Sequence, residues 1–560
     1  MKIVDAISFV NNLALRDISA VAKGFLACDL DLDMTSTGSI MLAELSLSTW
    51  VIKEDQVLVK YLNNWCNRFH LKLQDIQPGE FRFDTLDLSP VEKNILNSKT
   101  EEDIRSRLCL LKGVNSIIYS SVVSMINFDS RQGISLELSM NKDLLTTSWK
   151  FELLHSILDA TVEKNDDNPT VTISLNPVEN VYKETHDITS TWFYQSYKVV
   201  SEISSSNLCI AMPSSDDPQY PLLIKMSGEE VQGNSGSFRQ FLNTIIQEIH
   251  GTSLPILMPY MGNGPFKGMY QLRPGPIQIL TQKLLVYFGQ LIGMAVRSGI
   301  PLPLGLIPHF WKCLANVTIT AQDLADFDPE FESYLLKIEN CSSPNEFDIF
   351  LENHQYPAFV YQSITGGEIE LCKGGKNIGL TYENRQNYIS NLKMARHSEL
   401  ECKAQIEYIN MGLSTILPMR LIQGIFTWEE LQMKICGPED IELHLLKKYT
   451  IYQVGLSEED RHIQDFWQAL FSLSSKQQKM FIKFACNQER IPVPEVGDNL
   501  PPPYPMKIAP ADARDELQDN LLIRAETCIF MVKIPRYSTY DVMREKLLYS
   551  IFSADDPLSG

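Results

Sequence analysis

The chain has 560 residues, and its composition, 44% hydrophobic and 21% charged, is that of a globular protein too long for a single core. A net charge of −20 with no lysine- and arginine-rich run to offset it argues against nucleic acid as a partner. The 11 cysteines have no paired, zinc-type spacing, so we expect no metal, no cofactor and a reducing, cytoplasmic setting.

The N-terminal region, residues 1–215, is predicted to be mainly helical with some strands. Segments 58–74 and 101–126 place apolar residues three and four apart, which is the helical period. Segments 133–140 and 168–176 alternate apolar and polar residues, which predicts strands.

A second unit begins near residue 220 with a short apolar strand, a glycine-rich turn and a helix. Ser237 stands three residues before Gln240, the spacing of a capping box, and therefore predicts the start of that helix. Farther on, segment 369–382 has strand-like flanks around Gly374 and Gly375 and predicts a hairpin.

The most hydrophobic helix candidate is segment 280–299. Lys283 and Arg297 interrupt it, so it is predicted to lie in a core and not to span a membrane. Gly289 and Gly293 are four residues apart and would let another helix approach closely.

The last hundred residues are predicted to form a small α+β unit after a flexible joint at Gly455. Two helices (460–472 and 475–486), a proline-rich loop and a strand that carries Cys528 lead to a helix from about 540. That final helix has one apolar face, which consists of Met543, Leu547 and Ile551.

Cys528 follows Thr527 at the start of this apolar segment, only 32 residues from the C-terminus. It can be interpreted as a small buried core residue, the usual role of cysteine. It can also be interpreted as a partly exposed nucleophile, whose thiolate nearby Arg524 would favour. The residues themselves leave both interpretations open.

Four chemistries are candidates for this chain. A cysteine protease needs a histidine partner, and none of the nine histidines lies beyond His462. Metal catalysis and phosphoryl transfer lack their ligand clusters and phosphate loop. Thioester exchange remains, because a partly ionised thiol can attack an activated thioester without a dedicated base.

Residues from about 216 to 560 resemble the catalytic domain of HECT-type ubiquitin ligases, and segments before it (100–130 and STWFYQ) are similar to very large members of that family. The resemblance rests on motifs that occur in the right order: PLLIKMSGEEVQGNSGSFRQF, YFGQLIGMAVRSGIPLPL, FWKCL, DLADFDPEFESYL, TYENRQNYI, EELQMKICG, IQDFW, Arg490 with Pro492, and the TC and IPRY pair.

The resemblance implies an α+β, bilobal catalytic domain that uses no cofactor. Residues 216–451 would form the N-lobe, and residues 457–560 the C-lobe. A hinge at 452–456, around Val454 and Gly455, would join them. Cys528, with Thr527 and Arg490 as further catalytic residues, would accept ubiquitin from a ubiquitin-conjugating enzyme as a thioester and pass it to a lysine of a protein substrate.

Five apolar residues fall by position where the family binds its conjugating enzyme. Ordinary core packing explains each of them equally well, so both interpretations stay open. The five are Phe359, Tyr361, Ile369, Leu371 and Ile406.

The active-site run departs from the family pattern. Glu526 lies two residues before Cys528, where like charge would raise the pKa of the thiol, so Arg524 or Arg490 would have to compensate. A HECT-shaped scaffold that binds ubiquitin or its conjugating enzyme without accepting the thioester is therefore the alternative function.

Residues 501–504, Pro-Pro-Pro-Tyr, match the P-P-x-Y ligand of WW-type domains. A rigid loop within the C-lobe explains the same residues.

Overall fold

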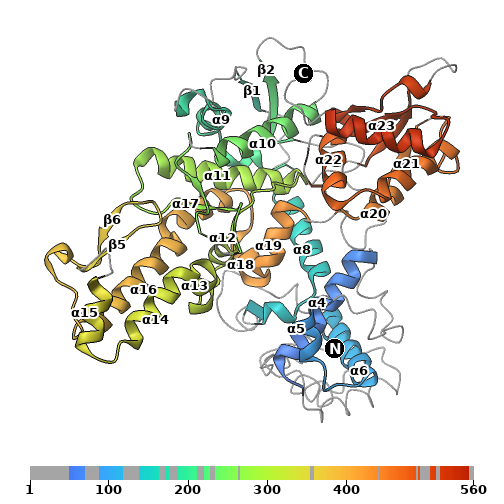
Figure 1. The fold of residues 1–560 in the computed structure, drawn as a ribbon. Helices are drawn as coiled ribbons and strands as arrows, with labels where there is room; N and C mark the ends of the chain where they lie inside the picture. Colours follow the sequence, from blue (N-terminus) through green and yellow to red (C-terminus); the bar gives the residue numbers. More distant parts are fainter. Residues whose placement is uncertain are drawn as a thin grey trace.

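The structure is a computed structural model (Figure 1). It describes residues 50–69, 88–117, 138–139, 141–162, 171–175, 187–210, 220–226, 234–251, 253–262, 265–352, 358–438, 441–453, 455–486, 488, 490–491, 505–511 and 518–553. The predicted Val454 and the Pro-Pro-Pro-Tyr segment lie outside these residues.

Three clusters of buried apolar side chains organise the described residues. The large core contains residues between Trp50 and Cys436. The arm core contains residues between Tyr260 and Leu400, and the C-terminal core runs from Leu443 to Ile551. The α+β fold is as predicted, with mostly helices and a few small sheets.

The large core is centred on two helices that pack against each other, α11 (Ile279–Arg297) and α17 (Lys403–Ser414). Gly289 and Gly412 make the close approach possible. A Cβ on Gly289 would lie 2.1 Å from the carbonyl oxygen of Ile409, and one on Gly412 would lie 1.8 Å from that of Val286. The predicted role of Gly289 is confirmed.

The other elements of the large core's C-terminal half surround this helix pair. They are β2 (Leu222–Met226), α10 (Asn234–His250), β3 (Leu257–Pro259), β4 (Tyr270–Leu272), α12 (Pro308–Leu314), α18 (Met419–Ile425) and α19 (Trp428–Cys436). Within the part of the chain that the structure describes, α11 has the length and apolar character to cross a membrane, but most of it is buried in this core.

The N-terminal region shares the large core. Figure 1 shows α4 to α6 at one end of the molecule, α8 between them and α19, and α9 and β1 beside α10. Strand β1 pairs in parallel with β2, with Val171 opposite Leu222. The elements are α4 (Ile52–Phe69), α5 (Pro90–Ile95), α6 (Glu101–Ile117), η6 (Lys142–Leu144), α8 (Thr147–Ala160), β1 (Val171–Leu175), η8 (Ile188–Ser190), α9 (Trp192–Val200) and η9 (Ser205–Leu208).

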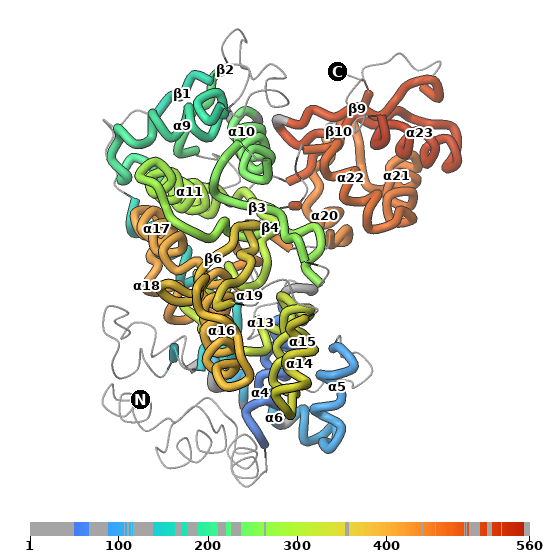
Figure 2. The backbone as a smooth tube through the Cα atoms, turned by 60° about the vertical axis from the view of Figure 1, so that its left-hand side comes forward, coloured from blue at the N-terminus to red at the C-terminus, as the bar shows by residue number. Residues whose placement is uncertain are grey.

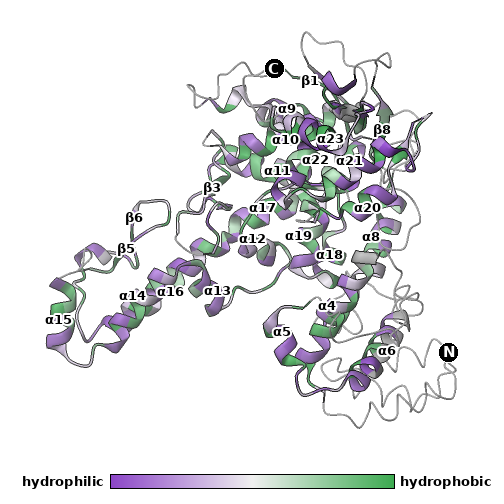
Figure 3. Ribbon diagram, turned by 45° about the vertical axis from the view of Figure 1, so that its right-hand side comes forward, coloured by the Kyte–Doolittle hydropathy of each residue, from purple (hydrophilic) through white to green (hydrophobic). Residues whose placement is uncertain are grey.

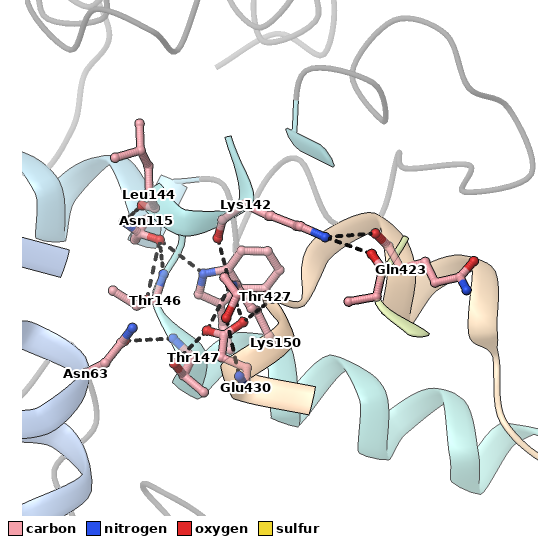
Figure 4. A network of polar contacts seen from close by, with 12 residues as sticks. Asn63, Asn115, Lys142, Leu144, Thr146, Thr147, Lys150, Gln423, Thr427 and Glu430 are labelled. Atoms are coloured by element: carbon pink, nitrogen blue, oxygen red, sulfur yellow. Dashed lines mark hydrogen bonds and ion pairs between the residues drawn. The ribbon is translucent and has the colours of Figure 1, made fainter. Parts of the chain in front are cut away.

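A buried polar network joins α8 to α19 (Figure 4). The ammonium of Lys150, which is fully buried, lies 2.7 Å from Oε2 of Glu430, and the hydroxyl of Thr147 donates to Oε1 of the same carboxylate. Glu430 also completes the capping box of α19 with Thr427. Lys142 donates to two main-chain carbonyls, those of Ala315 and Gln423. The N-terminal region is therefore tied to the first turn of α19.

The arm core belongs to a projection that points away from α11 and α17 (Figure 3). Antiparallel strands β5 and β6 form its small sheet, with Tyr361 opposite Ile369. Its elements are α13 (Ala321–Phe327), α14 (Pro329–Asn340), α15 (Pro344–Glu352), β5 (Val360–Gln362), β6 (Glu368–Glu370), η10 (Gly375–Asn377) and α16 (Arg385–Glu401).

The C-terminal core is built around a four-stranded sheet in the order β7-β8-β10-β9, in which only β9 and β10 are antiparallel. Met543, Leu547 and Ile551 all face this core, as predicted. The elements are α20 (Leu443–Lys448), β7 (Ile451–Tyr452), α21 (Arg461–Phe471), α22 (Ser475–Cys486), β8 (Lys507–Pro510), η11 (Gln518–Asn520), β9 (Arg524–Glu526), η12 (Thr527–Ile529), β10 (Met531–Ile534) and α23 (Tyr540–Ser553).

Three local predictions were wrong. Residues 138–139, predicted as part of a strand, are helical. Helix α10 begins at Asn234, so Ser237 is a buried residue inside the helix and not its cap. Segment 369–382 is not a hairpin, because β6 pairs with the preceding strand β5 across the turn at Gly366. Gly374 nevertheless has the predicted positive φ, 77°.

The predicted boundary between the lobes is also wrong. Helix α20 and strand β7 precede Gly455, yet Leu443 and Leu446 belong to the C-terminal core and Ile451 pairs with Lys507 of β8. Tyr452, Gln453 and Leu456 therefore belong to the C-terminal unit. The change from one core to the other occurs between Cys436 and Leu443.

Candidate active site

Cys528 is the middle residue of η12, the single helical turn that joins β9 to β10. Its side chain lies outside the described part of the structure, so the core and nucleophile interpretations are distinguished here only through its neighbours. Ile529, the next residue, is 41% exposed, and Thr527 is partly buried. The turn thus lies at the surface of the C-terminal unit.

Phe530 anchors this turn. Its side chain is buried in the C-terminal core, and its backbone has φ 50°, a left-handed conformation that is uncommon for a residue other than glycine. Its carbonyl accepts a 2.8 Å hydrogen bond from the amide of Lys507 on β8. The ring and the carbonyl together fix the point at which η12 ends.

The carboxylate of Glu526 has a partner that the sequence analysis missed. The ammonium of Lys533 lies 2.8 Å from Oε1 of Glu526, across the β9–β10 pair. The compensating cation is therefore Lys533. The predicted candidate Arg524 lies directly opposite Lys533 in the same ladder. The signal that could have identified the pair was the two short strands on either side of the TC turn.

Arg490, predicted as a catalytic residue, lies at the connection between the two cores. Its Nη1 donates a 2.7 Å hydrogen bond to the carbonyl of Gly437, the residue that ends α19. Gly437 has φ 73°, a backbone angle that is common at helix ends and that glycine adopts without strain. The structure thus gives Arg490 a contact on the large core.

Helix α10 approaches η12 from the large core. The buried guanidinium of Arg239 donates from Nη2 to the carbonyl of Thr527 at 3.0 Å. Figure 2 shows α10 beside the C-terminal unit from a second direction. Sequence reasoning did not identify Arg239, because nothing local links residues 239 and 527.

Burial makes five of the described cysteines poor nucleophiles at neutral pH. Burial raises the pKa of Cys486 to about 11, although the nearby cation of Arg239 lowers it. Burial also raises the pKa of Cys436 to about 11 and that of Cys313 to about 12. For Cys341 and Cys402 burial shifts the pKa in the same direction. Among the residues described, no group of three or more histidine, cysteine or acidic side chains could hold a metal ion.

The predicted conjugating-enzyme residues separate into two places. Phe359 and Tyr361 are buried in the arm core, with Leu371 partly buried against it, and Ile369 on β6 is 42% exposed. The amide of Leu371 donates to the carbonyl of Phe359, which holds these four residues together. Ile406 lies on α17 and is buried in the large core, so it does not join them, and its burial favours the interpretation as a core residue.

Gly455 is exposed, with φ 88° and open space around its Cα, which is typical of a surface turn. It follows β7 within the C-terminal unit.

Comparison with known proteins adds the family. Residues 222–556, more than half of the chain, match the family model described as HECT-domain (ubiquitin-transferase). The chain belongs to the HECT-domain family. The match begins at β2 and ends just after α23, so it includes the large core's C-terminal half, the arm and the C-terminal unit.

Two relatives extend the comparison beyond the HECT domain. The chain is 34% identical to the probable E3 ubiquitin-protein ligase HECTD4 of Homo sapiens, over 99% of this chain and 14% of that protein. It is 26% identical to the E3 ubiquitin-protein ligase HERC2 of Mus musculus, over 82% of this chain and 9% of that protein. The similarity therefore includes the region before the HECT domain. The predicted resemblance to very large members of the family is confirmed.

Proposed function

We propose that this chain is a ubiquitin ligase that carries ubiquitin as a thioester on Cys528. The observation that supports it most directly is the position of Cys528 in η12, a surface turn of a HECT domain. In the same domain, burial raises the pKa of Cys486 and Cys436 to about 11, which disfavours their thiolates. The partner of Glu526 also matters. Lys533 offsets its charge, so this carboxylate is a smaller obstacle to a thiolate than the sequence suggests.

The reaction would proceed in two exchanges. In the first, the Cys528 thiolate attacks the carbonyl carbon of the thioester that joins ubiquitin to a conjugating enzyme. A new S–C bond forms, and the thiolate of the conjugating enzyme leaves. In the second, a lysine amine attacks the same carbonyl carbon, a C–N bond forms, and the Cys528 sulfur leaves with the electron pair while the amine loses its proton. The two steps divide one transfer between two sites.

We further propose that the conjugating enzyme docks on the arm. Phe359 and Tyr361 support that surface from inside, and the exposed Ile369 offers an apolar contact. The lobes would be 216–438 and 441–560, with the joint in the chain between Gly437 and Leu443.

The test is a non-reducing gel after incubation with activating enzyme, conjugating enzyme, ATP and ubiquitin. We expect a reductant-sensitive adduct that Cys528→Ala abolishes. Cys486→Ala, the matched control in the same unit, should retain it. An equal adduct in the Cys528 variant would reject the assignment. Conjugating-enzyme binding without any adduct on the wild-type chain would identify the scaffold instead.

A further inference from the structure

The contact between Arg239 and Thr527 joins two separate hydrophobic cores. Arg239 lies on α10 between Phe238 and Phe241, both of which are buried in the large core. Thr527 begins the turn that Phe530 anchors in the C-terminal core. Arg239 is only 2% exposed, so the residue is enclosed between the two cores.

The atoms involved show what this hydrogen bond holds. The carbonyl of Thr527 belongs to the peptide group that links Thr527 to Cys528. Its other donor is the amide of Phe530, at 3.5 Å, whereas Nη2 of Arg239 lies at 3.0 Å. A hydrogen bond from a cation is shorter and stronger than one between neutral groups. Arg239 is therefore the stronger partner of the peptide next to the proposed nucleophile.

A second cross-contact, from Arg490 to Gly437, lies at the connection between the cores. The two bonds define a docked arrangement in which η12 lies against α10. In Figures 1 and 3 the arm with α14 and α15 lies on the opposite side of the molecule from the C-terminal unit. A conjugating enzyme on the arm would be on the far side from the Cys528 turn.

This geometry separates the two chemical steps. For charging, the turn has to leave α10 and reach the conjugating enzyme, so the Arg239 bond is absent from that transition state. A contact made in only one arrangement favours that arrangement and the steps that take place in it. The bond can therefore assist discharge, but it can only oppose departure of the turn toward the arm.

We propose that Arg239 is a positioning residue for discharge, which rests on the proposed function of Cys528. It holds the Thr527–Cys528 peptide against α10 while an acceptor amine displaces the Cys528 sulfur from ubiquitin. The amine forms the new C–N bond, the C–S bond breaks, and the proton that the amine loses is available to the released thiolate. Arg239 acts through the backbone of the turn and touches neither ubiquitin nor the amine.

The experiment measures the two steps separately on the whole chain. Charging is followed by single-turnover transfer from a pre-charged conjugating enzyme, and discharge by a chase with free lysine. In Arg239→Ala we expect discharge to slow on the order of tenfold, as small misplacements of a reacting group do. Charging should be as fast as in the wild type or faster. Arg239→Lys keeps a cationic donor and should recover part of the discharge rate.

A matched control distinguishes positioning from stability. Arg297 is also a buried arginine that donates to main-chain carbonyls, those of Ile416, Leu158 and Ile210, none of which belongs to the C-terminal core. Arg297→Lys should lower the melting temperature and leave the ratio of the two rates unchanged. The same ratio in Arg239→Ala as in the wild type, or slower charging with unchanged discharge, would overturn the role of Arg239.

Hydrogen exchange provides a readout without ubiquitin. Amides of η12 and β10 should exchange faster in Arg239→Ala than in the wild type, and unchanged exchange would overturn the proposal even if the variant is slow. A wild-type chain that forms no adduct would overturn the proposed function and with it the catalytic role of Arg239. Adduct formation with equal rates in both chains would overturn the role of Arg239 alone.

Discussion

The HECT domain of this chain has two junctions with neighbouring segments, and they are built differently. At the first, the N-terminal region shares one continuous core with the domain and adds strand β1 to β2. It also contributes the buried Lys150–Glu430 pair and receives the carboxylate of Glu248, which accepts from the amides of Trp192 and Phe193 at the start of α9. At the second, two separate cores meet through the hydrogen bonds of Arg239 and Arg490.

The two junctions differ in whether they can open while the chain on either side stays folded. Separation of the N-terminal region would expose apolar side chains of the shared core to water and break both the β1–β2 pairing and the Lys150–Glu430 pair. Separation of the C-terminal unit would break hydrogen bonds from two arginines to backbone carbonyls, groups that water can solvate once they are exposed. The first junction is part of one folded body, and the second is suited to opening.

The largest effect is expected at the first junction. Lys150→Met leaves Glu430 charged and buried, and we expect a loss of about 3–5 kcal/mol in the free energy of unfolding, the usual cost of breaking a buried pair. Urea unfolding would measure it. Lys60→Met, at the exposed Lys60–Glu92 pair, is the control and should cost at most about 1 kcal/mol. A similar small loss in Lys150→Met would mean that the N-terminal region is only loosely attached.

A smaller effect is expected at the second junction. Arg490→Ala removes the hydrogen bond to Gly437. We expect the free energy of separating the C-terminal unit from the large core to fall by about 1 kcal/mol, which raises the open population about fivefold. A glutamate-specific protease, which can cut after Glu442, should cleave the chain faster by about that factor. Arg461→Ala, at an exposed side chain of the same unit, should cut at the wild-type rate. Equal cleavage rates for Arg490→Ala and Arg461→Ala would mean that the Arg490 hydrogen bond does not hold the junction closed.

A third effect is a pH dependence at the first junction. Burial lowers the pKa of Lys142 from 10.5 to about 8 in the folded chain. Between these two values the unfolded chain binds a proton that the folded chain does not, so this group makes stability rise with pH. The wild type should therefore gain stability relative to Lys142→Met as the pH rises from about 8 toward 10.5, by less than about 1.4 kcal/mol per pH unit. A difference that falls over this range would contradict the environment described for Lys142.

The sequence predicted what depends on local periodicity. The buried face of α23 and the close helix approach at Gly289 follow from residue spacing alone, and the structure confirms both. The family was also predictable, since its motifs occur along the chain in order. The turn that carries Cys528 was found within this framework, although the segment is two short strands around η12 and not one strand.

What the sequence did not predict depends on contacts between distant segments. Gly455 has the local marks of a joint, but its unit is decided by the pairing of Ile451 with Lys507. Ile406 is apolar, as a docking residue would be, but it lies on the face of α17 that packs in the large core. Arg490 and Arg239 both donate hydrogen bonds across the junction between the two cores. Their partners, Gly437 and Thr527, are distant in the sequence, so no local pattern predicts either contact.

Helix α19 is anchored at both ends, and this matters for how a mechanical force passes through the structure. Glu430 in its first turn is held by Lys150 of the N-terminal region, and Gly437 directly after its last residue is held by Arg490 of the C-terminal unit. Nine helical residues span only about 13 Å at 1.5 Å per residue. Because both ends of this short helix are anchored, a torque applied to the N-terminal region would be transmitted through α19 to the joint between the large core and the C-terminal unit.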